Sequence, residues 1–97
     1  MLRVRYSVAA EADLHSIADY TLGRWGEAQT NRYLAVLERA CERLGGAPEL
    51  GRACDWLSSG LRRMEEGSHV IFFIVQGKGI LVVRVLHKSM SPELRTF

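Results

Sequence analysis

Five basic side chains in the second half of this 97-residue chain are of the types that a phosphate-handling site uses. A metal-free ribonuclease needs a base for the 2′-OH proton, an acid for the leaving oxygen and cations for the phosphate. His87 and Lys88 could fill two of these roles, but successive residues of a strand point to opposite faces of a sheet. No carboxylate is clearly placed to act as the base, so we expect no catalytic residue. The five side chains, which three neighbouring strands could bring together, are Arg62, Arg63, Arg84, His87 and Lys88.

The sequence indicates neither a metal site nor a cofactor site. His15 and His69 have no ligand-like neighbours, and Cys41 and Cys54 lack the spacing of a metal site. No glycine loop of the phosphate-cradling kind is present in the sequence. We therefore expect no metal and no cofactor, and we interpret both cysteines as reduced thiols of a cytosolic protein.

The charge pattern and the hydropathy pattern predict a cytoplasmic protein that binds other proteins rather than nucleic acid. The formal net charge is only +2, which argues against strong non-specific binding to nucleic acid. After Gly77 there are four basic residues and one acidic residue, so this end could meet an anion or an acidic protein. The first residues, MLRVRYS, lack the apolar segment of a secretory signal, and no apolar run approaches the ~18 residues of a membrane span.

Hydrophobic periodicity predicts one α+β domain over residues 1–97, with the element order β-α-α-β-β-β. Residues 2–8 alternate between apolar and polar, which is typical of a half-buried strand, and Ser7 is a suitable N-cap for the next element. Apolar residues then recur at steps of three and four on both sides of Gly26, which predicts an antiparallel helix hairpin. Three further strands are expected around residues 61–66, 69–75 and 80–87, after a loop at 47–59.

The helix hairpin is expected to pack on one face of a mainly antiparallel sheet. The segment HVIFFIV is apolar at both parities, which favours a central strand covered on both sides. Arg84 lies in mid-strand, and a buried unpaired guanidinium would be very costly, so its face should be open. Arg3 and Arg5 lie opposite the apolar face of the first strand and agree with this. The last strand should place Leu81, Val83, Val85 and His87 under the helices, and Ile80, Val82, Arg84, Leu86 and Lys88 on the open side.

An open face that mixes apolar side chains with arginines indicates a binding site for another protein, because small domains rarely leave a contiguous apolar patch bare. The alternative is that the loop at 47–59 folds across this face. Trp56, which stands beside Leu57 in that loop, is then either a lid over the core or an anchor for a partner.

The ordered set of segments resembles the ParE-type toxins of the RelE/ParE superfamily of bacterial toxin–antitoxin systems. The resemblance is carried by YSVAAEADLHSIADY, RYLAVLERACERLGGAPELGR, GLRRMEEGSHVIFF and RVLHKSM, which together span nearly the whole chain. It implies a small cytosolic toxin that a ParD-type antitoxin holds inactive in a hetero-oligomer. It also implies that the free toxin acts on DNA gyrase and blocks replication without being an enzyme.

RelE-type relatives share the fold but cut mRNA on the ribosome, and this is the alternative function. Such nucleases tend to carry a tyrosine or a similar group late in the chain, whereas the only late aromatic residue here is Phe97. Ser91 stands where ParE relatives often have an aspartate. The nuclease alternative would rest on Arg62, Arg84 and His87.

The family pattern and the expected open face together suggest two sets of contact residues. The short segment Met90–Phe97 is the expected place of part of the target contact. Neither sequence-specific contact with nucleic acid nor contact with a membrane is expected. Candidates for the antitoxin contact are Arg3, Arg5, Trp56, Leu57, Ile80, Val82, Arg84 and Leu86, and candidates for the target contact are Arg62, Arg63, His87, Lys88, Arg95 and Phe97.

Overall fold

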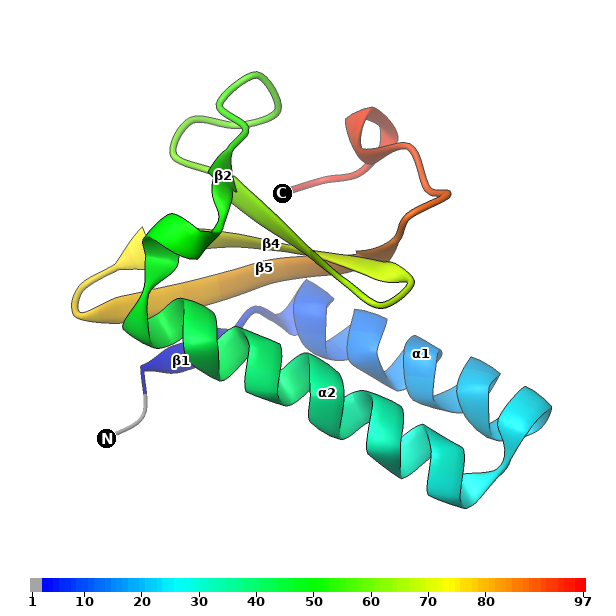
Figure 1. Cartoon of the computed structure of the whole chain (residues 1–97). Coiled ribbons are helices and arrows are strands. Elements are labelled where there is room, and N and C mark those ends of the chain that lie inside the picture. The colour runs from blue at the N-terminus through cyan, green and yellow to red at the C-terminus, as the bar shows by residue number, and fades with distance from the viewer. Residues whose placement is uncertain (1–2) are drawn as a thin grey trace.

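The computed structural model, which describes residues 3–97, has two helices packed on a mixed five-stranded sheet (Figure 1). This arrangement confirms the expected α+β class. Leu2, which was placed in the first strand, lies outside the described residues. The elements are β1 (Val4–Tyr6), α1 (Val8–Trp25), α2 (Glu27–Gly46), the 3-10 turn η1 (Pro48–Leu50), β2 (Arg52–Ala53), β3 (Arg62–Glu66), β4 (His69–Gln76), β5 (Gly79–His87) and the 3-10 turn η2 (Pro92–Leu94).

The strands lie in the order β1-β5-β4-β3-β2, so β4 is at the centre, as its apolar run predicts. β1 runs parallel to β5, and all other neighbouring strands are antiparallel. The sequence pattern does not predict β2, in which Arg52 and Ala53 pair with β3. A strand of two residues is too short to show the alternation by which strands are recognised.

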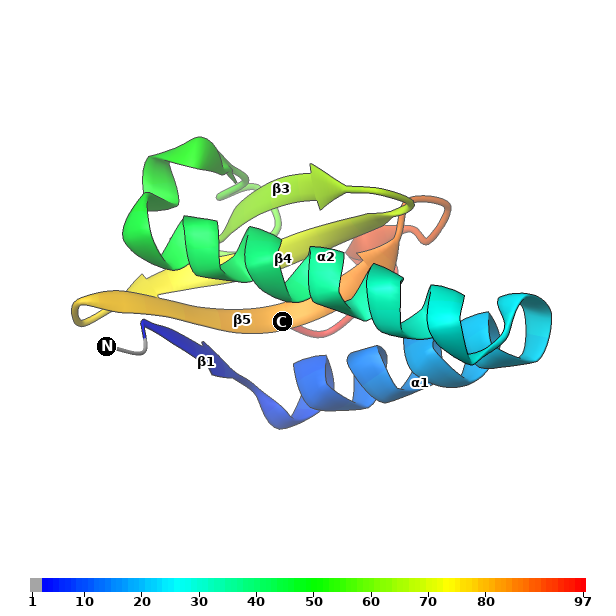
Figure 2. The same ribbon diagram turned by 60° about the horizontal axis from the view of Figure 1, so that its bottom comes forward.

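The helix hairpin covers one face of the sheet, as Figure 2 shows. α1 begins at Val8 because the Ser7 hydroxyl accepts a hydrogen bond from the Ala10 N–H at 3.0 Å, as expected of an N-cap. Gly26, with a φ of 85°, allows the chain to turn directly from α1 into α2. Neither helix of the described chain is long and apolar enough to cross a membrane.

The core between the hairpin and the sheet joins α2 to β4. Leu37 and Leu44 of α2 pack with Ile71 and Phe73 of β4, and all four side chains are essentially buried. Burying each such side chain contributes about 1.5–3 kcal/mol. These contacts hold the apolar stripe of the hairpin against the sheet and so fix where α1 lies.

The alternation of side chains along β5 changes phase in mid-strand. Val83 has no partner in β4, and the extra residue makes a β-bulge. Before the bulge, Ile80 and Val82 face the helices and are fully buried. The prediction that these two residues lie on an open face is therefore wrong. An extra residue moves every later side chain of the strand to the opposite face of the sheet. The residues on both sides of this bulge are apolar, so the sequence pattern gives no sign of the change.

The second face of the sheet is covered by the chain itself. The expectation that Leu86 offers surface to a partner is wrong, because this residue is only 3% exposed. The alternative, in which the loop at 47–59 folds across the face, is closer to the structure, although the cover also takes Leu61 and Phe97 from outside that loop. β2 pairs with β3 and so carries that segment over the sheet, where burying apolar side chains is favourable. The cover consists of Cys54, Leu57, Leu61 and Phe97, and it lies over Val70, Phe72 and Leu86.

Candidate functional site

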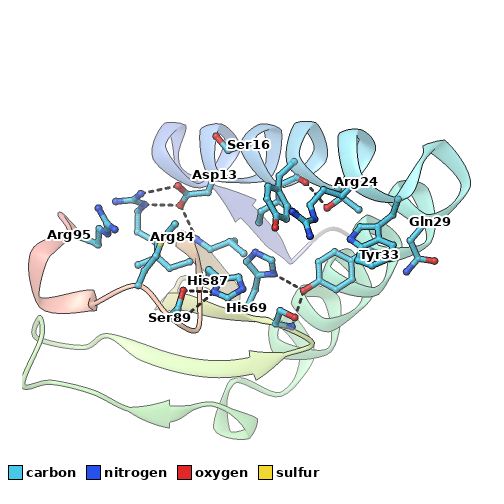
Figure 3. Close-up of a pocket in the computed structure, with 18 residues that line it drawn as sticks. Asp13, Ser16, Arg24, Gln29, Tyr33, His69, Arg84, His87, Ser89 and Arg95 are labelled. Carbon is cyan, nitrogen blue, oxygen red and sulfur yellow. Dashed lines mark hydrogen bonds and ion pairs between the residues drawn. The ribbon is translucent and has the colours of Figure 1, made fainter.

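A groove of about 800 Å³ runs between α1 and the second half of β5 (Figure 3). It forms because β1 pairs only with residues 80–82 of β5, so that in the described chain the rest of this edge faces α1 instead of a strand. Ile17 and Val85 contribute buried apolar side chains to it. The remaining lining includes Tyr20, Arg24, Trp25, Tyr33, His69, Arg84, His87, Ser89, Met90 and Arg95.

An ion pair between α1 and β5 fixes the middle of the groove. The two carboxylate oxygens of Asp13 accept hydrogen bonds from Arg84 Nε and Nη2 at 2.7 and 2.8 Å, and both side chains are less than one-fifth exposed. Asp13 Oδ2 also accepts from the Val85 N–H at 2.9 Å, where a neighbouring strand would otherwise bond. The hydrogen bond to Asp13 raises the pKa of Arg84 above its usual value. Arg84 thus has the partner that its mid-strand position required, but that partner lies within the chain.

Two histidines face each other across β4 and β5 at one end of the groove. His69 and His87 are paired in register, with ring centroids 5.3 Å apart. The Tyr33 hydroxyl accepts from the Ser68 N–H at 3.0 Å and lies within hydrogen-bond distance of His69 Nδ1, at 2.6 Å. Burial, with a smaller effect of His87, lowers the pKa of His69 below 6.5. The surroundings of His69 thus favour its neutral form.

The groove combines exposed aromatic rings with unneutralised cations. Tyr20 and Trp25 are 63% and 65% exposed, although large aromatic side chains are usually buried. The guanidinium of Arg24 lies over the Tyr20 ring, 5.4 Å from its centroid. Arg95 adds a further positive charge, whereas the lining carboxylate, that of Asp13, is engaged by Arg84. Such a lining suits an amphipathic peptide that carries acidic side chains.

A smaller hollow of about 270 Å³ lies on the second face of the sheet, between the segment after β2 and the end of the chain. Trp56, 64% exposed, stands at this hollow and is not a lid over the core. Arg63 lies over the Phe72 ring, 5.5 Å from its centroid. Glu65 makes long ion pairs with both Arg63 and Lys88, at 3.7 and 3.6 Å.

The predicted contact residues therefore divide between the two faces. Arg84 and Arg95 line the groove, and His87 lines both the groove and the smaller hollow. Arg3 directly precedes the edge strand β1 and hydrogen-bonds to Lys78 O, and Arg5 lies within β1 and hydrogen-bonds to the Gln76 side chain. Trp56, Arg63 and Lys88 surround the smaller hollow, and Leu57 and Phe97 belong to the cover of the second face.

Arg62 has a structural role that its position in the sequence does not reveal. Its Nε and Nη2 donate to the carbonyls of Pro48 and Gly51 at 3.2 and 2.6 Å. These bonds tie β3 to the turn that follows α2. Because its donors are directed to the main chain, Arg62 offers little to a target, in contrast to Arg63.

Sequence reasoning missed the residues that α1 and α2 bring to the groove. Asp13, Tyr20 and Trp25 come from α1, and Tyr33 comes from α2. Tyr20 and Trp25 gave a usable signal, since two aromatic residues close together at a helix end are candidates for a binding surface. The pairing of Asp13 with Arg84 gave none, because 71 residues separate them.

Metal binding finds no support in the described chain. No group of three or more histidine, cysteine, aspartate or glutamate side chains is placed to hold an ion among residues 3–97. Cys41 and Cys54 are buried free thiols, in agreement with their interpretation as reduced. Burial raises the pKa of Cys41 to about 11, so this thiol carries a proton at neutral pH.

Comparison with solved structures shows which fold this arrangement represents. The chain superposes on a chain of the chromosomal ParDE TA system from P. aeruginosa with a TM-score of 0.74 and 21% identity, over 90% of this chain and 96% of that one. It superposes on a chain of the toxin–antitoxin complex RelBE2 from Mycobacterium tuberculosis with a TM-score of 0.63 and 21% identity, over 90% and 91% of the two chains. These similarities show the RelE/ParE fold.

Sequence comparison identifies the family within that fold. Residues 4–92 match the family model described as the ParE toxin of the type II toxin–antitoxin system parDE. Toxin ParE1 of Mycobacterium tuberculosis is 45% identical over 92 residues, which cover 94% of each chain. The chain therefore belongs to the ParE toxin family of type II toxin–antitoxin systems.

Proposed function

We propose that this protein inhibits DNA gyrase in the cytoplasm, and thereby blocks replication, unless a ParD-type antitoxin is bound to it. Membership of the ParE family supports this function. The superposed structures from P. aeruginosa and Mycobacterium tuberculosis are a ParDE system and a RelBE2 complex, which supports an antitoxin as partner. The toxin and the antitoxin would form a hetero-oligomer.

The antitoxin occupies the groove between α1 and β5 in this proposal. The observation that carries the assignment is the pair of exposed aromatic side chains, Tyr20 and Trp25, beside the unneutralised Arg24 and Arg95. A few residues provide most of the binding energy in protein interfaces, and tryptophan, tyrosine and arginine are enriched among them. An antitoxin segment with apolar side chains on one side and carboxylates on the other would match both features.

The target contact is assigned to the second face and the end of the chain. Arg63, Lys88 and Trp56 surround the smaller hollow, and Phe97 packs beside it on Phe72. Arg95 lies at the groove, so an antitoxin bound there would cover one of the target candidates directly. Placing the two partners on neighbouring surfaces explains how one would exclude the other.

The contacts of the arginines favour a toxin that is not itself an enzyme. The nuclease alternative requires Arg62, Arg84 and His87 to act on one phosphate. Arg62 is bonded to main-chain carbonyls, and Arg84 is paired with Asp13. The Arg62 donors are thus directed to the main chain, and the charge of Arg84 is already balanced by Asp13, which leaves little of either to stabilise the charge that develops during phosphoryl transfer.

The test compares gyrase inhibition with RNA cleavage by the same purified protein. We expect the protein to inhibit supercoiling by gyrase and to trap gyrase with cleaved DNA, and we expect its expression to cause filamentation and a DNA-damage response. Arg63→Gln should weaken the inhibition, whereas Arg43→Gln, on the exposed side of α2, should not. Rapid mRNA cleavage that His87→Ala abolishes, with supercoiling intact, would replace the gyrase proposal by the nuclease alternative.

A further inference from the structure

The segment Met90–Phe97, called the tail below, is attached to the sheet by few long-range contacts. Within it only Pro92 and Phe97 are even half-buried. The Phe97 ring packs on the Phe72 ring with centroids 4.9 Å apart. The Thr96 carbonyl accepts a hydrogen bond from Arg84 Nη1 at 3.3 Å. The end of the tail is thus held by the packing of the Phe97 side chain on the second face and by one long hydrogen bond.

Arg84 connects this tail to α1 through a single guanidinium. Its Nε and Nη2 donate to the Asp13 carboxylate at 2.7 and 2.8 Å, whereas its Nη1 donates to a neutral carbonyl at 3.3 Å. A carboxylate accepts a shorter and stronger hydrogen bond from a guanidinium than a neutral carbonyl does, because both partners are then charged. Of the donors of Arg84, Nη1 is therefore the one that a newly arriving carboxylate would capture first.

The groove is the place from which such a carboxylate would arrive. Arg84 and Arg95 both line it, and Arg95 is itself part of the tail. We propose that a carboxylate bound in the groove competes with the Thr96 carbonyl for Arg84 Nη1 and so releases the tail from the second face. By thermodynamic linkage, release of the tail must strengthen carboxylate binding by the same factor.

This coupling would give the antitoxin a means of neutralising the toxin at a distance from its own contacts. The inference rests on the proposed function for this consequence, since the tail carries Arg95 and Phe97, two candidates for the target contact. An acidic segment in the groove would then separate the tail residues from the rest of the target contact, and it would also cover the edge of that contact. The physical coupling itself involves only Arg84, Asp13 and the tail.

The first experiment measures the tail by NMR in the free protein. Arg84→Lys keeps a positive charge opposite Asp13, but a single ammonium lacks the planar fork that serves Asp13 and Thr96 together. We expect the contact between the Phe97 and Phe72 rings to weaken and the fraction of molecules with an undocked tail to rise about fivefold, the effect of one hydrogen bond. Arg43→Lys, at an exposed ion pair of α2, is the matched control and should change neither.

The second experiment uses the unaltered protein, so it remains decisive if Arg84→Lys fails to fold. Titration with a capped hexaglutamate peptide should shift the Arg84 signals and weaken the Phe97–Phe72 contact, whereas capped hexaglutamine should not. Phe97→Ala should bind hexaglutamate more tightly. Absence of hexaglutamate binding at Arg84, or binding that leaves the ring contact unchanged or strengthens it, would overturn the inference. Neither gyrase nor an antitoxin is present, so these results are independent of the proposed function.

Discussion

Removing the carboxylate of Asp13 should cost this protein a large share of its stability. Deleting one partner of a buried ion pair typically costs about 3–5 kcal/mol, because the other charge stays buried and unpaired. Here the side chains of Asp13 and Arg84 remain 14% and 18% exposed, so water compensates for part of that loss. The Val85 N–H also loses its acceptor, which adds about 1 kcal/mol. We therefore expect Asp13→Ala to lower the free energy of unfolding by about 2–4 kcal/mol.

Urea denaturation followed by circular dichroism measures this loss, and each 1 kcal/mol should also lower the melting temperature by about 4–8 °C in a domain of this size. Asp13→Asn retains an acceptor for the Val85 N–H and should lose about half as much. Asp19→Ala, at an exposed position of the same helix, is the matched control and should change stability by less than about 0.5 kcal/mol. If Asp13→Ala were as stable as Asp19→Ala, the ion pair would not hold α1 to β5 in solution.

Three further results are expected. The pKa of His69 is lowered in the fold, so the unfolded chain binds the proton more readily, and the stability of the protein should fall as the pH drops below about 6.5. Urea titrations at pH 7 and pH 5 should show a smaller fall in His69→Gln than in the unaltered protein. Gly79→Ala would place a Cβ against the main chain of Arg3, which directly precedes β1. Stability should decrease by about 2 kcal/mol or more, with faster hydrogen exchange throughout β1. Trp25→Ala and Trp56→Ala remove similarly exposed side chains; calorimetry should show antitoxin binding at least about tenfold weaker for Trp25→Ala alone, and the reverse result would place the antitoxin on the second face.

The local pattern of the sequence was sufficient to predict the two helices, the strands other than β2, and their order. Ser7 caps α1 because its hydroxyl needs only the N–H three residues away. The helix hairpin follows from two apolar stripes joined at Gly26, and the central place of β4 follows from a strand that is apolar at both parities. Each of these features depends on residues close together in the chain. The family resemblance could be recognised for the same reason, because it consists of short segments that follow one another in a fixed order along the chain.

The faces of β5 and the binding surfaces depended on contacts between distant residues. The bulge at Val83 is visible only in the pairing of β5 with β4, and it moves Ile80 and Val82 from the expected open face into the core. The cover of the second face is decided by β2, which has too few residues to show a period.

The groove shows most clearly what tertiary structure alone decides. It exists because β1 stops short along β5 and because Asp13, 71 residues from Arg84 in the chain, fills the edge that β1 leaves. Hydrophobic periodicity reports how each element divides into faces, but it carries no information on which charged side chains will meet when the elements pack. The sequence by itself therefore determined the architecture and the family, and the packing of α1 against β5 decided where a partner can bind.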